Sequence, residues 1–169
     1  MRYPVLIFTS KEYTMKKILI FLFVLVNKIS LAQSDKNPVS FLNPAELSTP
    51  RGYTHVTITD LGNCKMVMIS GQVPLDRNGN LVGKDDFAKQ TEQVFINIRH
   101  AVTAAGGTMD QLVKIGVYVL DASQLQVFRD IRNKFVNVKN PPASTLVQVS
   151  RLFREDVLVE IEAMAIIPK

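Results

Sequence analysis

Two glutamates near the end of the chain have a spacing that general acid–base chemistry can use. Glu160 and Glu162 lie two residues apart in "LVEIEAMA", a segment that alternates polar and apolar residues. If this segment is a strand, both carboxylates point to one face of a sheet. Carboxylates held close together raise the pKa of one of them, which suits a group that exchanges a proton near neutral pH. In a second interpretation both are polar contacts of an interface, one of them paired with Lys114.

Other candidate residues lie at the ends of predicted strands. The glycine in Ser70-Gly71-Gln72 permits close approach of a ligand or a neighbouring segment. Tyr53 is either a hydrogen-bond donor at the rim of a cleft or an ordinary strand aromatic, and we expect His55 to be a half-exposed strand residue. In "NPPASTLVQV" two prolines fix the direction of the chain, so that Ser144 is presented to a face of the sheet without any charged neighbour.

The elements that must position these residues follow from hydrophobic periodicity. Amphipathic stripes predict two helices, one from Asp85 or Asp86 to Ala105 and one from Ser123 to Val136. Alternating or β-branched segments predict strands at 53–60, 65–73, 112–120, 144–150 and 157–167. The order ββαβαββ contains two strand–helix–strand crossovers, which are right-handed and therefore place both helices on the same face of one sheet. This is an α+β domain.

The period of two separates the faces of this sheet. The predicted helix-covered face is apolar and holds Val67, Ile69, Val113, Ile115, Val117, Val119, Thr145, Val147, Val149, Val159, Ile161, Ala163 and Ala165. The predicted opposite face is mixed and holds Met66, Met68, Ser70, Gln72, Lys114, Gly116, Tyr118, Leu120, Ser144, Leu146, Gln148, Ser150, Leu158, Glu160, Glu162 and Met164. The mixed face has too many apolar side chains to be fully exposed to solvent and too many charged ones to be buried in a hydrophobic core. We therefore expect a subunit interface with polar clefts that hold a small molecule.

Composition and charge argue against nucleic acid as a partner. The 169 residues have a pI of about 9.4, but residues 1–32 hold five of the 20 basic residues and one acid. Residues 33–169 hold 15 basic and 14 acidic residues, a net charge of +1, which is no electrostatic footprint for RNA or DNA. The single cysteine, Cys64, cannot form an intramolecular disulfide and has no ligand spacing for a metal.

The first 32 residues predict a signal peptide that starts at Met15. Lys16-Lys17 precede the apolar run Ile18–Val26, and Ser30-Leu31-Ala32 provides small residues before a cleavage site. Cleavage after Ala32 would yield a periplasmic or secreted protein without stable membrane insertion; the alternative is an uncleaved apolar helix. Residues 33–50 carry three prolines and predict a linker or surface arm, and residues 51–169 form the predicted domain.

Several segments together resemble the Rid/YjgF family of reactive-intermediate deaminases. They are "ISGQVPLDRNGNLVG", "QTEQVFINIRHAVTAAGGTMDQLVKIGVYVLD", "NPPASTLVQVSRL" and "LVEIEAMA", and the resemblance covers residues 50–167. It implies a chorismate-mutase-like fold that assembles as a homotrimer with three clefts between subunits. It also implies hydrolysis of enamines and imines such as 2-aminoacrylate to a keto acid and ammonia, without a metal or an organic cofactor.

The resemblance also assigns positions to the cleft. Tyr53, Ser70, Gly71 and Gln72 match cleft-lining positions of the family, and Glu160 matches the acid that orients or activates the attacking water.

The chain departs from the family after Pro142-Ala143. Active deaminases have there an arginine that binds the substrate carboxylate, usually followed by Ser and a Cys or small residue. This chain has Ser144, Thr145 and Leu146. An arginine–carboxylate pair contributes about 1.5–3 kcal/mol, so a 2-imino acid would bind roughly ten- to over a hundredfold more weakly. Arg51 is a candidate substitute cation; otherwise Ser144 and Thr145 could hydrogen-bond a neutral ligand.

The sequence therefore predicts a hydrolase that acts on a small imine, enamine or related C–N compound, with a substrate other than a typical 2-imino acid. The competing prediction is a non-catalytic trimer that binds a small ligand or a protein. Ribonuclease activity, reported for parts of the family, is disfavoured by the near-neutral body and the lack of a histidine pair.

Overall fold

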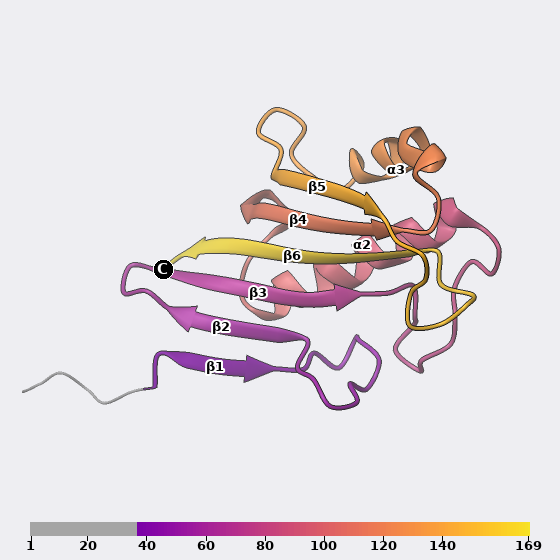
Figure 1. Cartoon of the computed structure of the whole chain (residues 1–169). Helices are drawn as coiled ribbons and strands as arrows, with labels where there is room; N and C mark the ends of the chain where they lie inside the picture. Colours follow the sequence, from indigo (N-terminus) through magenta and orange to yellow (C-terminus); the bar gives the residue numbers. More distant parts are fainter. Residues whose placement is uncertain (1–36) are drawn as a thin grey trace, which may run out of the picture. The chain divides into compact units, whose positions relative to one another are not determined.

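The computed structural model describes residues 37–169, so the predicted signal peptide lies outside the described residues. Three strands, a helix, a strand, a second helix and two strands follow one another along this part of the chain (Figure 1). The strands are β1 (Val39–Leu42), β2 (Val56–Asp60), β3 (Cys64–Gln72), β4 (Leu112–Val119), β5 (Ala143–Gln148) and β6 (Val159–Pro168). Strand β1 and the buried Leu47 come from the segment predicted as a linker or arm, which therefore contributes to the sheet and the core.

The helices begin and end at residues whose chemistry suits those positions. Helix α2 (Phe87–Ala104) is capped by Asp86, whose side chain accepts a hydrogen bond from the Lys89 backbone N–H. Its end is followed by Gly106 with a φ of 88°, a left-handed conformation that glycine adopts without strain. Helix α3 (Leu125–Arg132) is shorter than predicted, because the 3-10 turn η2 (Ala122–Gln124) precedes it and tighter turns follow it, such as the hydrogen bond from the Lys134 N–H to the Ile131 carbonyl. A second 3-10 turn, η1 (Met109–Gln111), leads into β4.

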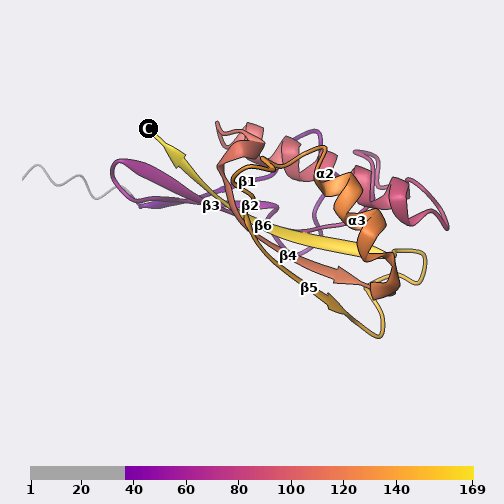
Figure 2. The same cartoon turned by 90° about the horizontal axis from the view of Figure 1, so that it is seen from above.

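The strands form one sheet in the order β1-β2-β3-β6-β4-β5. Strands β4 and β5 are parallel, and the other neighbours are antiparallel. Helix α2 connects β3 to β4 and helix α3 connects β4 to β5, and Figure 2 shows both helices on the same side of the sheet. The predicted α+β class with both helices on one face is confirmed.

Aromatic and β-branched side chains fill the space between the helices and the sheet. The Phe95 ring of α2 lies 5.3 Å from the ring of Phe135 and 6.1 Å from that of Phe128. Ile115 on β4 and Ile161 on β6 are fully buried beneath them. Each such side chain contributes about 1.5–3 kcal/mol through burial, so this layer holds the sheet in a defined position under the helices.

A β-bulge in β3 changes which of its side chains face the helices, so part of the predicted assignment of faces is wrong. Ile69 pairs with Ala163, but Gln72 pairs with Ile161, so three residues of β3 advance against two of β6. Gln72 therefore lies on the helix-covered face and is only 2% exposed, which makes its predicted place on the mixed face wrong.

A second irregularity, in β4 between Leu112 and Lys114, buries Leu112 and leaves Val113 42% exposed. The predicted burial of Val113 on the helix-covered face is therefore wrong.

The predicted faces of β5 are reversed. In the parallel β4–β5 pair, Ser144 lies beside the buried Ile115, and Thr145 lies beside Gly116. Leu146 packs against the core, whereas Val147 is 42% exposed. The sequence pattern of this edge strand is only weakly amphipathic, so its pairing with β4 decides which side chains turn inward.

Candidate functional site

The face of the sheet away from the helices is called the open face below (Figure 2). It holds Thr57 on β2, Met66 and Met68 on β3, Lys114, Gly116 and Tyr118 on β4, Thr145 and Val147 on β5, and Glu160, Glu162 and Met164 on β6. Leu120 and Leu158, predicted on this face, instead line a pocket beside the helices. The methionines, both glutamates and Lys114 are on the face that the sequence predicted.

Glu160 packs against Gly71 on the neighbouring strand. A β-carbon built on Gly71 would overlap Glu160 Oε1 and approach Glu160 Cγ to 3.1 Å. The bulge in β3 brings this glycine to the open face, because regular alternation from the buried Ile69 would place Gly71 on the helix-covered side. Glycine at position 71 therefore provides the space in which the carboxylate lies.

The environment of Glu160 favours its protonated form. Partial burial raises the pKa of the Glu160 carboxyl above its ordinary value of 4.5, and the nearby Glu162 carboxylate raises it further. Among the described residues three ion pairs are formed, and neither glutamate takes part in one. A half-buried carboxylate without a cationic partner is a good proton acceptor, because protonation relieves its desolvation.

Tyr53 lies within electrostatic range of Glu160, and its role at the rim of a cleft stays a prediction. Burial, and after it the charge of Glu160, raises the pKa of the Tyr53 hydroxyl, which therefore keeps its proton. Its ring meets the ring of His55 edge to face at 5.1 Å, and 46% of Tyr53 is exposed. A phenol that remains protonated next to a carboxylate is a hydrogen-bond donor for a ligand or a water molecule.

Glu162 repeats this arrangement on the other side of β6. It pairs with Gly116, whose missing β-carbon would come within 2.6 Å of Glu162 Oε1. The Tyr118 hydroxyl donates a hydrogen bond of 3.3 Å to that same oxygen. Tyr118 is also the cross-strand partner of Glu160, and the charges of Glu162 and then Glu160 raise the pKa of its hydroxyl. The sequence placed Tyr118 on this face but did not identify it as a partner of either carboxylate.

Lys114 points toward β5 and not toward the glutamates. Its ammonium group donates a hydrogen bond of 2.7 Å to the Thr145 hydroxyl. The interpretation in which Lys114 forms an ion pair with Glu160 or Glu162 is therefore wrong.

Ser70, Gln72 and His55 form a structural network beneath Tyr53. The Ser70 hydroxyl donates to the Thr54 carbonyl at 2.6 Å, and the Gln72 amide donates to the Ser70 carbonyl at 2.9 Å. The same amide lies 3.3 Å from His55 Nδ1, while His55 Nε2 donates to the Ser48 carbonyl at 2.8 Å. His55 is 3% exposed, so its predicted half-exposure is wrong. These side chains hold the loop that carries Tyr53.

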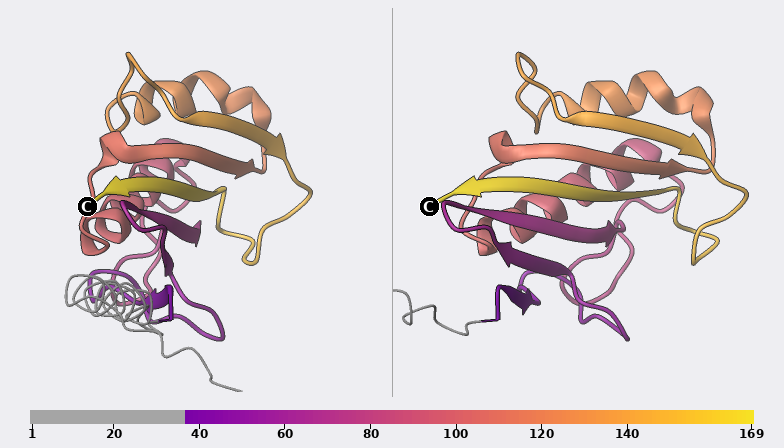
Figure 3. Two further views of the ribbon diagram at one scale, coloured as in Figure 1. Left: turned by 90° about the vertical axis from the view of Figure 1, so that its left-hand side faces the viewer. Right: turned by 60° about the vertical axis from the view of Figure 1, so that its left-hand side comes forward.

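Ser144 and Leu146 are separated from Glu160 within one chain. Ser144 is the cross-strand partner of Ile115 and lies on the helix side of β5. Glu160 is the cross-strand partner of Tyr118 and lies on the open face. Figure 3 shows that β5 is the edge of the sheet opposite β1. A single chain therefore does not bring Ser144 and Glu160 into one site. Arg51, the candidate substitute cation, is exposed two residues before Tyr53.

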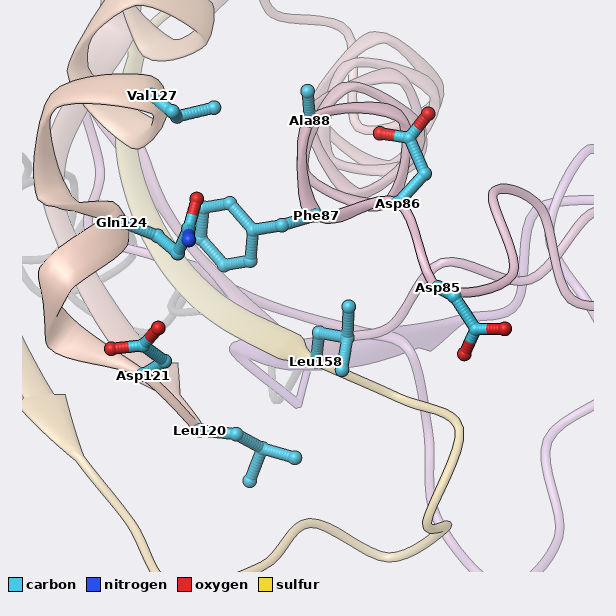
Figure 4. A pocket seen from close by; sticks show the side chains of 9 residues that line it. All are labelled: Asp85, Asp86, Phe87, Ala88, Leu120, Asp121, Gln124, Val127 and Leu158. Atoms are coloured by element: carbon cyan, nitrogen blue, oxygen red, sulfur yellow. The ribbon is translucent and has the colours of Figure 1, made fainter.

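A pocket of about 480 Å³ lies where α2 and α3 begin (Figure 4). Phe87, Val127 and Leu158 line it together with three aspartates. Asp121 accepts hydrogen bonds from the Ser123 hydroxyl and backbone N–H, and Asp86 accepts one from the Lys89 backbone N–H; these bonds lower the pKa of both carboxyls. These carboxylates serve as helix caps and are poor proton acceptors, so the open face is the better candidate site.

Residues 37–169 contain no helix that combines the length and the apolar character of a membrane-spanning segment. In the same part of the chain, no three His, Cys, Asp or Glu side chains gather closely enough to hold a metal ion.

Comparisons with known proteins agree with this geometry. Residues 45–167 match the profile of the family described as Endoribonuclease L-PSP. A RutC family protein of Saccharolobus solfataricus is 39% identical over 100 residues, which cover 59% of this chain and 78% of the relative. A 2-iminobutanoate/2-iminopropanoate deaminase of Salmonella typhimurium is 35% identical over 114 residues, or 66% of this chain and 86% of the enzyme. The crystal structure of RidA from an Antarctic Psychrobacter superposes with a TM-score of 0.66 at 30% identity, covering 75% of this chain and 98% of RidA.

Proposed function

The chain belongs to the Endoribonuclease L-PSP family, and on that premise we propose that it hydrolyses the C=N bond of a small imine, including the imine tautomer of an enamine. The observation that carries the proposal is the half-buried Glu160 carboxylate, which lies against Gly71 without a cationic partner among the described residues. The similarity to a 2-iminobutanoate/2-iminopropanoate deaminase supports the same chemistry. The reaction needs water and a proton acceptor, and it uses neither a metal nor an organic cofactor.

In the proposed mechanism Glu160 accepts a proton from water as the water oxygen attacks the imine carbon. The electron pair of the C=N bond moves to nitrogen, which takes the proton from Glu160, and a carbinolamine forms. Glu160 then accepts the carbinolamine hydroxyl proton and transfers it to nitrogen as the C=O bond forms, the C–N bond breaks and ammonia leaves. The Tyr53 hydroxyl orients the ligand or the water, because it lies beside Glu160 and keeps its proton.

The cleft is proposed to form between subunits of a homotrimer. Ser144 and Glu160 lie on opposite faces of one chain, so a site that contains both needs two copies. The open face also carries apolar surface, since Met68 is 40% exposed and Phe41, the β1 partner of Thr57, is 68% exposed. Burying such side chains against a second copy removes them from water. The proposed cleft joins Glu160, Tyr53 and Gly71 of one subunit with the Ser144–Leu146 segment of the next.

The substrate is proposed to differ from a typical 2-imino acid. No arginine follows Pro142-Ala143, and the nearest cation on the open face, Lys114, is engaged with Thr145. A ribonuclease, which the family description names, is not favoured here, because the carboxylates of the open face repel phosphate. The alternative that remains is a trimer that binds a small ligand without catalysis.

The test measures the release of carbonyl product from imines that an oxidase generates in the same reaction mixture. We expect wild type to accelerate hydrolysis of at least one small imine above its spontaneous rate, and Glu160→Gln to lose about 10²-fold or more of that acceleration. Equal rates for wild type, Glu160→Gln and buffer on every imine would favour the non-catalytic trimer. Circular dichroism and light scattering of the variant establish that it remains folded and assembled.

A further inference from the structure

The open face carries more negative charge than water activation requires. One carboxylate, Glu160, is sufficient to accept a proton, yet Glu162 lies close enough to raise the pKa of the Glu160 carboxyl. Glu162 is exposed, and it is oriented by the hydrogen bond from the Tyr118 hydroxyl. Because Tyr118 is also the cross-strand partner of Glu160, one aromatic side chain borders both carboxylates.

Resting on the imine hydrolysis proposed above, we propose that the substrate is a small cationic iminium compound without a carboxylate, and that Glu162, oriented by Tyr118, recognises its positive charge. A carboxylate accepts hydrogen bonds from an iminium N–H, and an aromatic ring such as that of Tyr118 attracts a cation to its face. The proposal adds a binding role for Glu162 and a positioning role for Tyr118 to the catalytic role of Glu160.

The position of Lys114 disfavours a substrate with its own carboxylate. Along β4, Lys114 is two residues from Gly116, the partner of Glu162, and four residues from Tyr118, the partner of Glu160. At about 3.3 Å per residue these separations are about 7 and 13 Å. In a 2-imino acid the carboxylate is bonded directly to the reacting carbon. When that carbon lies at Glu160, its carboxylate is too far from Lys114 and is repelled by both glutamates.

The chemistry favours the same substrate class. A protonated imine is more electrophilic at carbon than a neutral one, and a neighbouring carboxylate stabilises it. Water adds to the iminium carbon, its proton passes to Glu160, and the π electrons neutralise the nitrogen. The proton then moves to nitrogen, the C–N bond breaks with formation of the C=O bond, and the last hydroxyl proton returns to the amine. The net reaction is iminium plus water to aldehyde or ketone plus ammonium.

The test uses two imines that differ by one carboxylate. A flavin-dependent amine oxidase produces the imine of ethylamine, and an amino acid oxidase produces 2-iminopropanoate from alanine. Competition with semicarbazide reports how far the protein accelerates each hydrolysis above its spontaneous rate. The variants are Glu162→Gln, Tyr118→Phe and Lys114→Gln, with Glu92→Gln on the exposed side of α2 as the matched control.

We expect wild type and Glu92→Gln to accelerate hydrolysis of the carboxylate-free imine about tenfold or more above that of 2-iminopropanoate. Glu162→Gln should raise KM for the carboxylate-free imine about tenfold to a hundredfold with a smaller change in kcat, because a charge-assisted hydrogen bond is lost. Tyr118→Phe should cause a smaller loss of the same kind, and Lys114→Gln should leave the preference unchanged.

The opposite preference would overturn the inference and leave the proposed function intact. In that case wild type would favour 2-iminopropanoate, and Lys114→Gln would abolish the advantage. If no imine is hydrolysed, the proposed function fails, and NMR titration with ethylammonium and with propionate decides the charge preference of the site. Ethylammonium binding that weakens in Glu162→Gln supports the recognition role, and preferential binding of propionate contradicts it.

Discussion

The carboxylate of Glu160 occupies the space that a β-carbon at Gly71 would fill, so β6 and β3 fit together here because position 71 has no side chain. Gly71 has no left-handed φ, in contrast to Gly52, Gly62, Gly79, Gly83 and Gly106. Glycine is therefore required at position 71 because the Glu160 side chain of β6 occupies the adjacent space, and not because of its backbone conformation. This contact leads to the first prediction.

Gly71→Ala should reduce imine turnover about 10²-fold or more, because the methyl group displaces the proton acceptor. Gly116→Ala is the matched comparison, since it displaces Glu162 and leaves Glu160 in place. It should weaken apparent affinity for a cationic substrate more than it lowers turnover. Steady-state kinetics on both variants separates the two effects, and unchanged turnover in a folded Gly71→Ala trimer would show that the position of Glu160 does not matter.

Glu160→Gln should become more stable relative to wild type as the pH rises. The pKa of the Glu160 carboxyl is raised in the folded state above its ordinary value of 4.5. Folding therefore favours the protonated carboxyl, which adds to the free energy of unfolding at low pH. This stabilisation is lost as the pH rises through the pKa of the folded state. Glutamine is neutral throughout. Thermal unfolding from pH 4 to pH 7 should show the Tm difference moving in favour of the variant, and parallel curves would argue against the raised pKa.

Ser144→Arg should raise activity toward 2-iminopropanoate about tenfold to a hundredfold, mainly through apparent affinity, because it adds a cation for the substrate carboxylate. Leu146 limits the gain if it crowds the guanidinium. Glu160→Gln in the Ser144→Arg background should abolish it.

Subunit mixing then tests where the cleft lies. In a mixture of wild type with the Ser144→Arg, Glu160→Gln double variant, the wild-type chain carries the Glu160 carboxylate and the variant chain carries the new guanidinium. No single chain carries both groups. Recovery of activity in mixed trimers supports a cleft between subunits, and its absence in verified mixed trimers contradicts that arrangement.

Residues 33–169 should assemble into a particle of about three times the monomer mass in light scattering. Met68→Lys should shift the protein toward monomer, because it places a charge on the apolar part of the open face. Val138→Lys is the control, since Val138 is 61% exposed in the segment between α3 and β5. A wild-type protein that is monomeric at micromolar concentration would rule out assembly through the open face.

Export is predicted from the residues that precede the described structure. Lys16-Lys17, the apolar run Ile18–Val26 and Ser30-Leu31-Ala32 favour cleavage after Ala32. N-terminal sequencing of the protein from its native host should therefore begin at Gln33, and the protein should fractionate with periplasmic or secreted material. An intact chain that starts at Met1 or Met15 in the cytosol would contradict the prediction.

The fold class and the shared face of the two glutamates could be predicted from the sequence. Glu160 and Glu162 are separated by one residue in a strand, and a period of two places them together whatever the rest of the sheet does. The stripes of α2 and α3 and the handedness of crossovers placed both helices on one face. These conclusions depend on the period of a strand and the handedness of a crossover, which do not change with the register of the strands.

The tertiary structure decided which partners surround those glutamates. The bulge in β3 turned Gln72 into the core and brought Gly71 to Glu160, and a bulge is defined by the register between two strands. Similarly, Ser144 and Leu146 face the helix side of β5 because of their pairing with β4. A one-residue change of register reverses the face of every side chain in a strand, and register is set by long-range packing that no local pattern contains.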